Sequence, residues 1–205
     1  MFYSDLFTAF TAGLLLVGLA ELGDKTFFIA ALMAMNHPRR LVFAGAFGAL
    51  AVMTLLAVSA GQVIGLLPTQ WVKIGEVVLF AGFGLKLLYD GLRMGCHDSD
   101  HDEVEEAKAA IAAAEGTQTD PKALSALGII GKTFGLVFLG EWGDRTQITT
   151  VMLAASHPPL GVACGALLGF FLCIGLAVVA GRLSERFITL FAGALFLMFA
   201  IAAIF

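Results

Sequence analysis

Long apolar runs are the feature that most constrains what this chain can fold into. A helix needs about 20 consecutive apolar residues to cross the hydrocarbon core of a bilayer. The composition fits such helices, because 59% of the residues are hydrophobic and 14% are charged, whereas soluble domains are roughly 45–50% apolar. We therefore predict an all-α membrane protein with six transmembrane helices, at roughly residues 6–36, 41–65, 71–93, 125–156, 160–182 and 186–205.

Two of these runs and one polar segment depart from a simple bundle. Runs 6–36 and 125–156 are longer than a bilayer requires, so we expect each to tilt, break or project into water. The segment 94–124 is polar, and we expect a water-exposed connector there. Its stretch "EVEEAKAAIAAAE" favours a short helix, and we expect the rest to be mobile. We read its acidic start, "HDSDHDEVEE", as a solvated loop, with local cation enrichment as the alternative.

The chain is also an internal repeat with an offset of 120 residues. The offset aligns the polar motifs as well as the apolar runs, since it pairs Glu21 with Glu141, Asp24 with Asp144, and His37-Pro38 with His157-Pro158. Each copy holds three expected spans, an odd number, so the copies should cross the membrane in opposite senses. This predicts two inverted three-helix repeats, 1–93 and 125–205, joined by the connector 94–124.

Basic residues indicate how this bundle is oriented. They gather in the connector and in the two short loops on its side, whereas Lys73 is the only basic residue close to the other side. The positive-inside rule therefore places the connector in the cytoplasm and both termini on the opposite side. The start "MFYSDLFTAF" has an acid but no basic residue, so we read the first run as a permanent span and not as a signal peptide.

The motifs "ELGDKT" and "EWGDRT" place charges inside apolar runs. In a helix, residues three apart such as Glu21 and Asp24 share a face, and an inverted repeat brings both motifs together near the midplane. Each buried charge costs ~2.5–3.5 kcal/mol even on lenient insertion scales. Lys25 and Arg145 balance two of the four carboxylates. One divalent cation or two protons would neutralise the rest, which is a physical basis for exchanging one for the other.

The motifs offer oxygen ligands, which favour hard cations such as Mg²⁺, Ca²⁺ and Mn²⁺. In the alternative reading, Glu21–Lys25 and Glu141–Arg145 are ion pairs that only hold helices together.

We read His37 and His157 as helix-end residues, and Cys164 and Cys173 as packing residues. The candidate metal ligands are Glu21, Asp24, Thr26, Glu141, Asp144, Thr146 and Gln147, with Lys25 and Arg145 as charge-balancing or gating residues.

The duplicated pattern Glu-x-Gly-Asp-Lys/Arg-Thr resembles that of the Gdt-type cation/proton exchanger family. The resemblance covers all six expected spans, and it includes Trp142 and Arg145 of the second copy. It implies export of Mn²⁺ or Ca²⁺ from the cytoplasm in exchange for protons, with no cofactor and no enzymatic activity. The short six-span form resembles the bacterial branch, which implies the plasma (inner) membrane or a thylakoid membrane.

Two other functions are alternatives to this antiporter. A passive divalent cation channel would conduct without proton counterflow. An intramembrane aspartyl protease needs two aspartates that share a proton, but here a basic residue follows Asp24 and Asp144, and a glutamate stands three residues before each. The expected partners are a divalent cation, protons and the lipid bilayer, with no nucleic acid.

Overall fold

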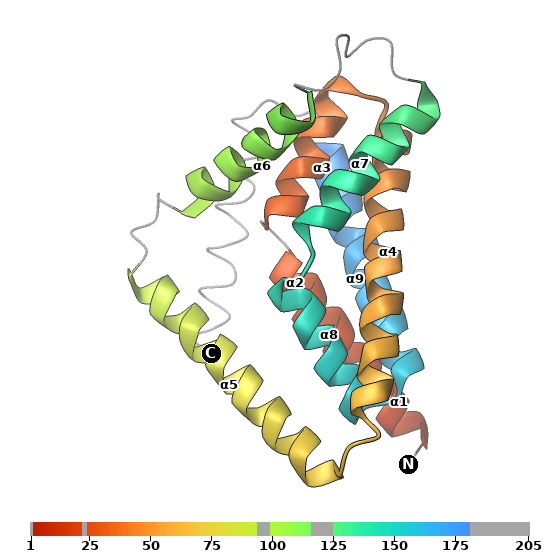
Figure 1. The fold of residues 1–205 in the computed structure, drawn as a ribbon, viewed down its shortest axis with the longest axis vertical. Helices are drawn as coiled ribbons and strands as arrows, with labels where there is room; N and C mark the ends of the chain where they lie inside the picture. Colours follow the sequence, from red (N-terminus) through yellow and green to blue (C-terminus); the bar gives the residue numbers. More distant parts are fainter. Residues whose placement is uncertain (1, 22–23, 94–98, 116–124, 181–205) are drawn as a thin grey trace.

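The structure is a computed structural model. It describes residues 2–21, 24–93, 99–115 and 125–180. Every regular element in these ranges is a helix (Figure 1). Two helices are long and apolar enough to cross a membrane, Arg39–Ile64 and Pro159–Val179. The described part of the chain is all-helical, and these two helices fit a membrane protein. The expected span 186–205 lies outside the described residues.

The helices follow the apolar runs closely. The first copy of the repeat forms α1 (Phe2–Ala12), a π-helical turn η1 (Gly13–Val17), α2 (Gly18–Glu21), α3 (Lys25–Asn36), α4 (Arg39–Ile64) and α5 (Thr69–Arg93). The connector forms α6 (Ser99–Glu115). The second copy forms α7 (Ala126–Gly140), α8 (Arg145–Ser156) and α9 (Pro159–Ala180).

Of the three outcomes expected for the two long runs, the structure shows a break in each. The run 6–36 is interrupted after Glu21, and the run 125–156 is interrupted over residues 141–144. The helical reading of the motif, in which residues three apart share a face, was therefore wrong. One physical reason is visible at Gly143, whose φ of 81° belongs to a left-handed conformation that glycine adopts without steric cost.

The two half-helices that follow the breaks are alike. Both α3 and α8 have 12 residues. Asp24 precedes α3 with φ −77° and ψ 166°, and Asp144 precedes α8 with φ −72° and ψ 167°. His37 and His157 end these helices in extended conformations, as expected for residues that precede proline. The prediction that both histidines lie at helix ends is confirmed.

The two broken segments run in opposite directions, and each packs on the long helix of the other copy. In Figure 1 the chain rises from α1 to α3 and descends from α7 to α8. A Cβ at Gly45 of α4 would lie 2.6 Å from the carbonyl oxygen of Ile130 in α7. The residue 120 positions later, Gly165 of α9, has the equivalent close approach to the carbonyl oxygen of Phe10 in α1. Glycine at both positions lets the helix backbones meet.

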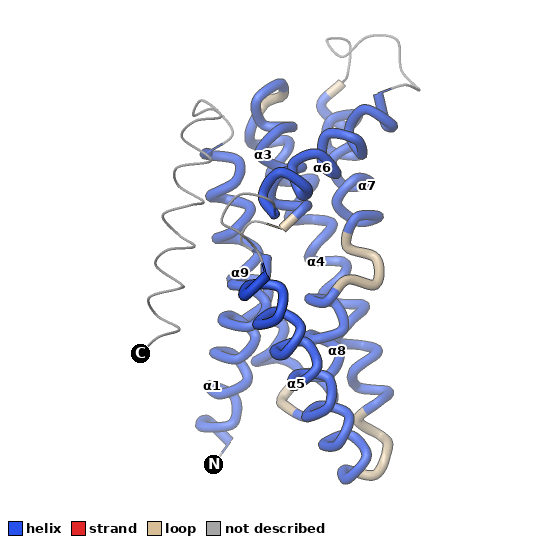
Figure 2. Tube along the Cα trace, turned by 90° about the vertical axis from the view of Figure 1, so that its left-hand side faces the viewer, coloured by secondary structure: helices blue, strands red, loops and turns tan. Residues whose placement is uncertain are grey.

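The connector is more ordered than the sequence indicated. Its acidic start belongs to helix α6, which packs against α3 and α7 (Figure 2). Ala107 is fully buried, and Val104 and Ile111 pack against the same apolar core. The interpretation of "HDSDHDEVEE" as a loop was therefore wrong from Ser99 onward. Three small or branched apolar residues at helical spacing are enough to dock this otherwise polar helix.

Candidate cation site at the helix breaks

The motif residues lie at the ends of the half-helices, where the backbone leaves its regular hydrogen bonding. Glu21 is the last residue of α2, and Glu141 follows directly after α7. In both copies the glutamate carbonyl accepts a hydrogen bond from the aspartate N–H, at 3.3 Å in the first and 3.1 Å in the second. Neither aspartate side chain caps its helix, so both carboxylates stay free for other partners.

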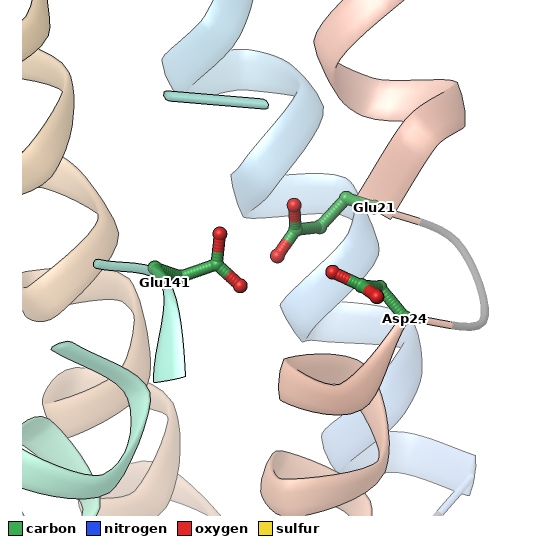
Figure 3. A group of neighbouring side chains, drawn as sticks. All are labelled: Glu21, Asp24 and Glu141. Carbon is green, nitrogen blue, oxygen red and sulfur yellow. The ribbon is translucent and has the colours of Figure 1, made fainter. Parts of the chain in front are cut away.

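Three of the four carboxylates converge. Glu21, Asp24 and Glu141 each place one oxygen within 4.8 Å of the others, and Figure 3 shows the three side chains pointing toward one another. Two come from the first copy of the repeat and one from the second. Glu21 is fully buried and Glu141 is 3% exposed. Asp144 is not part of this group of three.

A threonine supports the glutamate in each copy. The Thr26 hydroxyl donates to Glu21 Oε1 at 2.6 Å, and the Thr146 hydroxyl donates to Glu141 Oε2 at 3.1 Å. Both threonines are buried. Each hydroxyl keeps its lone pairs, so it fixes the carboxylate and stays available as a weak ligand.

The basic residues do not form the helix-internal ion pairs of the alternative reading. Arg145 bridges the copies, with Nη2 3.9 Å from Asp24 Oδ1 and Nε 4.0 Å from Asp144 Oδ1. Lys25 instead reaches the connector, where its Nζ lies 3.8 Å from Glu106 Oε2. One cation therefore pairs with two aspartates, and none of these three ion pairs involves Glu21 or Glu141.

The cluster carries more negative charge than this arrangement neutralises. Two ionised carboxylates whose oxygens lie within 4.8 Å of each other repel by at least about 3 kcal/mol at an effective dielectric constant of about 20. Among the described residues, Glu21 Oε2 and Asp144 Oδ2 are buried without a hydrogen-bond partner. A buried carboxylate oxygen without a donor is costly, so protons or a cation are needed at this cluster.

Two residues make contacts that the sequence did not indicate, although Cys173 lies in the apolar core as expected, whereas Cys164 is exposed. The side-chain oxygen of Gln147, a candidate ligand, accepts the N–H of Gly143 at 2.8 Å and holds the second break in shape. Cys173 of α9, read as a packing residue, donates from its thiol to the carbonyl oxygen of Glu21 at 3.4 Å. The apolar residues around Cys173 in the sequence gave no sign of this contact. The 120-residue offset of the repeat aligns Cys173 with Met53.

Opposed broken helices that meet at a buried acidic cluster are typical of the class of secondary transporters. Comparison with known proteins agrees. The family model of the divalent cation/proton antiporter GDT1 matches residues 9–95 and 129–205. The chain belongs to this GDT1 family.

Relatives match along nearly the whole chain. A GDT1-like protein of Synechocystis sp. is 48% identical over 202 residues, which is 96% of each chain. GDT1-like protein 4 of Oryza sativa is 40% identical over 98% of this chain and 74% of its own length. GDT1-like protein 5 of Arabidopsis thaliana is 37% identical over 98% and 96%. No solved structure matches the chain.

Membership confirms the family expected from the duplicated motif. It also confirms that the protein is an antiporter for divalent cations and protons, and not an enzyme. The aspartyl protease reading is thereby set aside.

Proposed function

We propose that this chain exports Mn²⁺ or Ca²⁺ from the cytoplasm in exchange for protons, with the ion held between the two helix breaks. The ligands are the carboxylates of Glu21, Asp24 and Glu141, with Thr26 and Thr146 beside them. The observation that carries the proposal is the convergence of three carboxylates from both copies within 4.8 Å. One of their oxygens, Glu21 Oε2, is buried without a partner.

Exchange follows from the charge of this cluster. Counted formally, the four motif carboxylates and the two motif cations sum to two negative charges, although Lys25 shares its charge with Glu106 of the connector. Either one divalent ion or two protons cancels these charges. Repulsion between the ionised carboxylates disfavours the cluster with neither bound. Because the divalent cation and the protons neutralise the same oxygens, binding of one displaces the other. Asp144 and Gln147 are not among the three converging residues, and we propose that they join the site when the second break changes shape.

The helix breaks supply the remaining parts of an ion site. The N-terminal ends of α3 and α8 carry partial positive charge, and they stabilise carboxylates placed at their first residues. The carbonyl groups at the C-terminal ends of α2 and α7 carry partial negative charge and can face a cation. Both kinds of helix end meet in one place only because the two broken segments run in opposite directions.

The topology we propose has six spans in two inverted repeats, 1–93 and 125–205, with connector 94–124 in the cytoplasm and both termini opposite. The matched breaks and the reciprocal Gly45 and Gly165 contacts support it. Rocking of the α4 and α9 layers against the broken helices would open the cluster to each side in turn. The membrane is the bacterial plasma membrane or a thylakoid membrane.

The test is cation-driven proton movement in proteoliposomes that contain the full chain and a trapped pH-sensitive dye. Mn²⁺, Ca²⁺ and Mg²⁺ are offered in turn. We expect Mn²⁺ or Ca²⁺ to drive protons the opposite way, and Asp24→Asn to abolish the signal. Asp5→Asn, at an exposed position of α1, is the matched control and should exchange normally. Cation entry without any proton signal would establish a channel instead.

A further inference from the structure

The two motif cations occupy aligned positions but have different partners. The 120-residue offset pairs Lys25 with Arg145, and each is the first residue of its half-helix. Arg145 stays between the breaks, 3.9 Å from Asp24 and 4.0 Å from Asp144. Lys25 instead lies 3.8 Å from Glu106 of α6. A positive charge that the repeat places at the breaks is thus held by the connector.

The Lys25 side chain lies close to both breaks. Lys25 follows Asp24 directly in the chain. A Cβ added at Gly140 would lie 3.5 Å from Lys25 Cε, and Gly140 directly precedes Glu141 at the second break. The side chain is 31% exposed, and lysine carries its charge on a flexible four-carbon stem. The same ammonium group can therefore turn to the connector or to the carboxylates of the cluster.

Apolar contacts, and not the ion pair, hold Glu106 in this position. Ala107 of α6 is fully buried, and the helix packs on α3 and α7 (Figure 2). The neighbouring Glu105 pairs with Lys108 of its own helix at 3.1 Å. Docking of α6 therefore presents one carboxylate to Lys25, while the carboxylate next to it in the chain has another partner.

The position of Lys25 changes the charge that a divalent cation meets at the cluster. While Glu106 holds Lys25, Arg145 is the one motif cation among the described residues that pairs with motif carboxylates. When α6 leaves, the Lys25 ammonium group loses that partner and turns toward Asp24 and the cluster, where it repels an incoming cation. A docked α6 and a bound divalent cation therefore favour each other.

We propose that Glu106 is a positioning residue for the cation site, and that docked α6 raises the affinity for divalent cations by holding Lys25 away from the cluster. This rests on the proposed function of the same cluster. Lys25 keeps its charge throughout, and only its partner changes. The effect is about two- to fivefold, because an exposed ion pair shifts an equilibrium by no more than that. Since such coupling is reciprocal, a bound cation strengthens docking of α6 by the same factor.

Mn²⁺ titrations of the purified full chain in detergent test this, at a pH above which the affinity no longer rises. We expect Glu106→Gln to lower the Mn²⁺ affinity about two- to fivefold. Glu105→Gln is the matched control, because it removes the same charge from the same helix but leaves the contact with Lys25, and it should bind as the wild type does. Lys25→Met should bind at least as tightly as the wild type, and adding Glu106→Gln to it should change nothing further.

Hydrogen–deuterium exchange measures the reciprocal effect on α6. Saturating Mn²⁺ should slow amide exchange over residues 104–114 of the wild-type chain by a similar two- to fivefold factor. In Lys25→Met the same addition should leave the exchange of α6 unchanged. If Glu106 only stabilised its own helix, Glu106→Gln would speed the exchange of α6 by the same amount with and without Mn²⁺.

The outcomes separate this inference from the proposed function. The inference is overturned if Glu106→Gln binds Mn²⁺ as tightly as Glu105→Gln does, or if it weakens binding equally in the Lys25→Met background. The antiporter proposal then still stands on the proteoliposome assay. If no cation moves protons in the wild-type chain, the proposed function fails, and the Mn²⁺ titrations still decide whether α6 sets the affinity of the cluster.

Discussion

The side chains at the breaks have two roles, and their hydrogen bonds distinguish these roles. Carboxylates supply charge, and hydroxyls hold those carboxylates in place. Thr26 donates to a glutamate, whereas Thr54 of α4, also buried, donates to the Leu50 carbonyl of its own helix. Threonines that bond their own helix backbone are common. The contact of Thr26 is specific to the motif.

Replacing Thr26 should therefore weaken cation binding and not folding. In Thr26→Val the Glu21 carboxylate loses its hydroxyl donor and its fixed orientation, so we expect apparent Mn²⁺ affinity to fall about tenfold. Thr26→Ser should restore most of it. Thr54→Val is the matched control, with unchanged affinity. Isothermal titration in detergent measures all four proteins, and equal affinities for Thr26→Val and the wild type would refute the role.

At the scale of elements, the important features are the two breaks and the connector helix. The breaks turn each long apolar run into a pair of half-helices whose ends face the cluster. Helix α6 then lies on α3 and α7, and its Glu106 reaches Lys25 at the first residue of α3. Both side chains of that ion pair are partly exposed, so it adds little stability. The buried Ala107 face is what docks α6.

A charge on that face should release α6. In Ala107→Asp a carboxylate would be buried without a partner, which is unfavourable enough to favour undocking. We expect a protease specific for glutamate to cut the connector several times faster than in the wild type. Ala109→Asp places the same charge on an exposed position of α6 and should be cut at the wild-type rate. Equal cleavage of both variants would show that α6 is not held by its apolar face.

The whole molecule is organised by reciprocal contacts between the copies. α4 packs on α7 and α8, and α9 packs on α1, η1 and α3. Each broken segment is therefore held by the long helix of the other copy. Neither copy alone could assemble the cluster, because Glu21 and Asp24 come from one and Glu141 from the other.

Glycine-to-alanine variants test this reciprocity. A methyl group at Gly45 or Gly165 would press on the backbone of the facing helix, and overpacking of this kind costs about 1–3 kcal/mol. We expect both variants to lower the melting temperature in detergent by similar amounts. Gly131→Ala, in α7 with open space around its Cβ, should leave it unchanged or raise it. A large loss at only one of the two sites would argue against equivalent packing.

Competition between protons and metal gives a prediction for the assembled site. Because both neutralise the same carboxylates, raising the pH should strengthen metal binding, by about tenfold per pH unit for each proton displaced. Mn²⁺ titrations at successive pH values measure this slope. Asp24→Asn removes one titratable ligand and should give a shallower slope. Affinity that does not change with pH would contradict proton–cation exchange at this cluster.

Much of the fold was predictable because it depends on local patterns. The apolar runs predicted the helices, and the His-Pro pairs predicted where α3 and α8 end. The 120-residue offset predicted that the two acidic motifs would meet, and Glu21, Asp24 and Glu141 do converge. The expectation that Glu21 and Asp24 share a helix face was wrong, because the chain leaves the helix after Glu21; in the second copy the equivalent break contains Gly143 with a positive φ, a conformation that residue types alone do not reveal.

The sequence by itself determined the membrane environment, the repeat and the acidic motifs, since hydrophobicity and charge are properties of the residues themselves. Only the tertiary structure decided which partners the motifs find. It paired Arg145 with aspartates of both copies, docked α6 on α3, left Asp144 outside the group of three, and set Cys173 against Glu21. These contacts join residues far apart in the chain, so they depend on how one copy packs against the other.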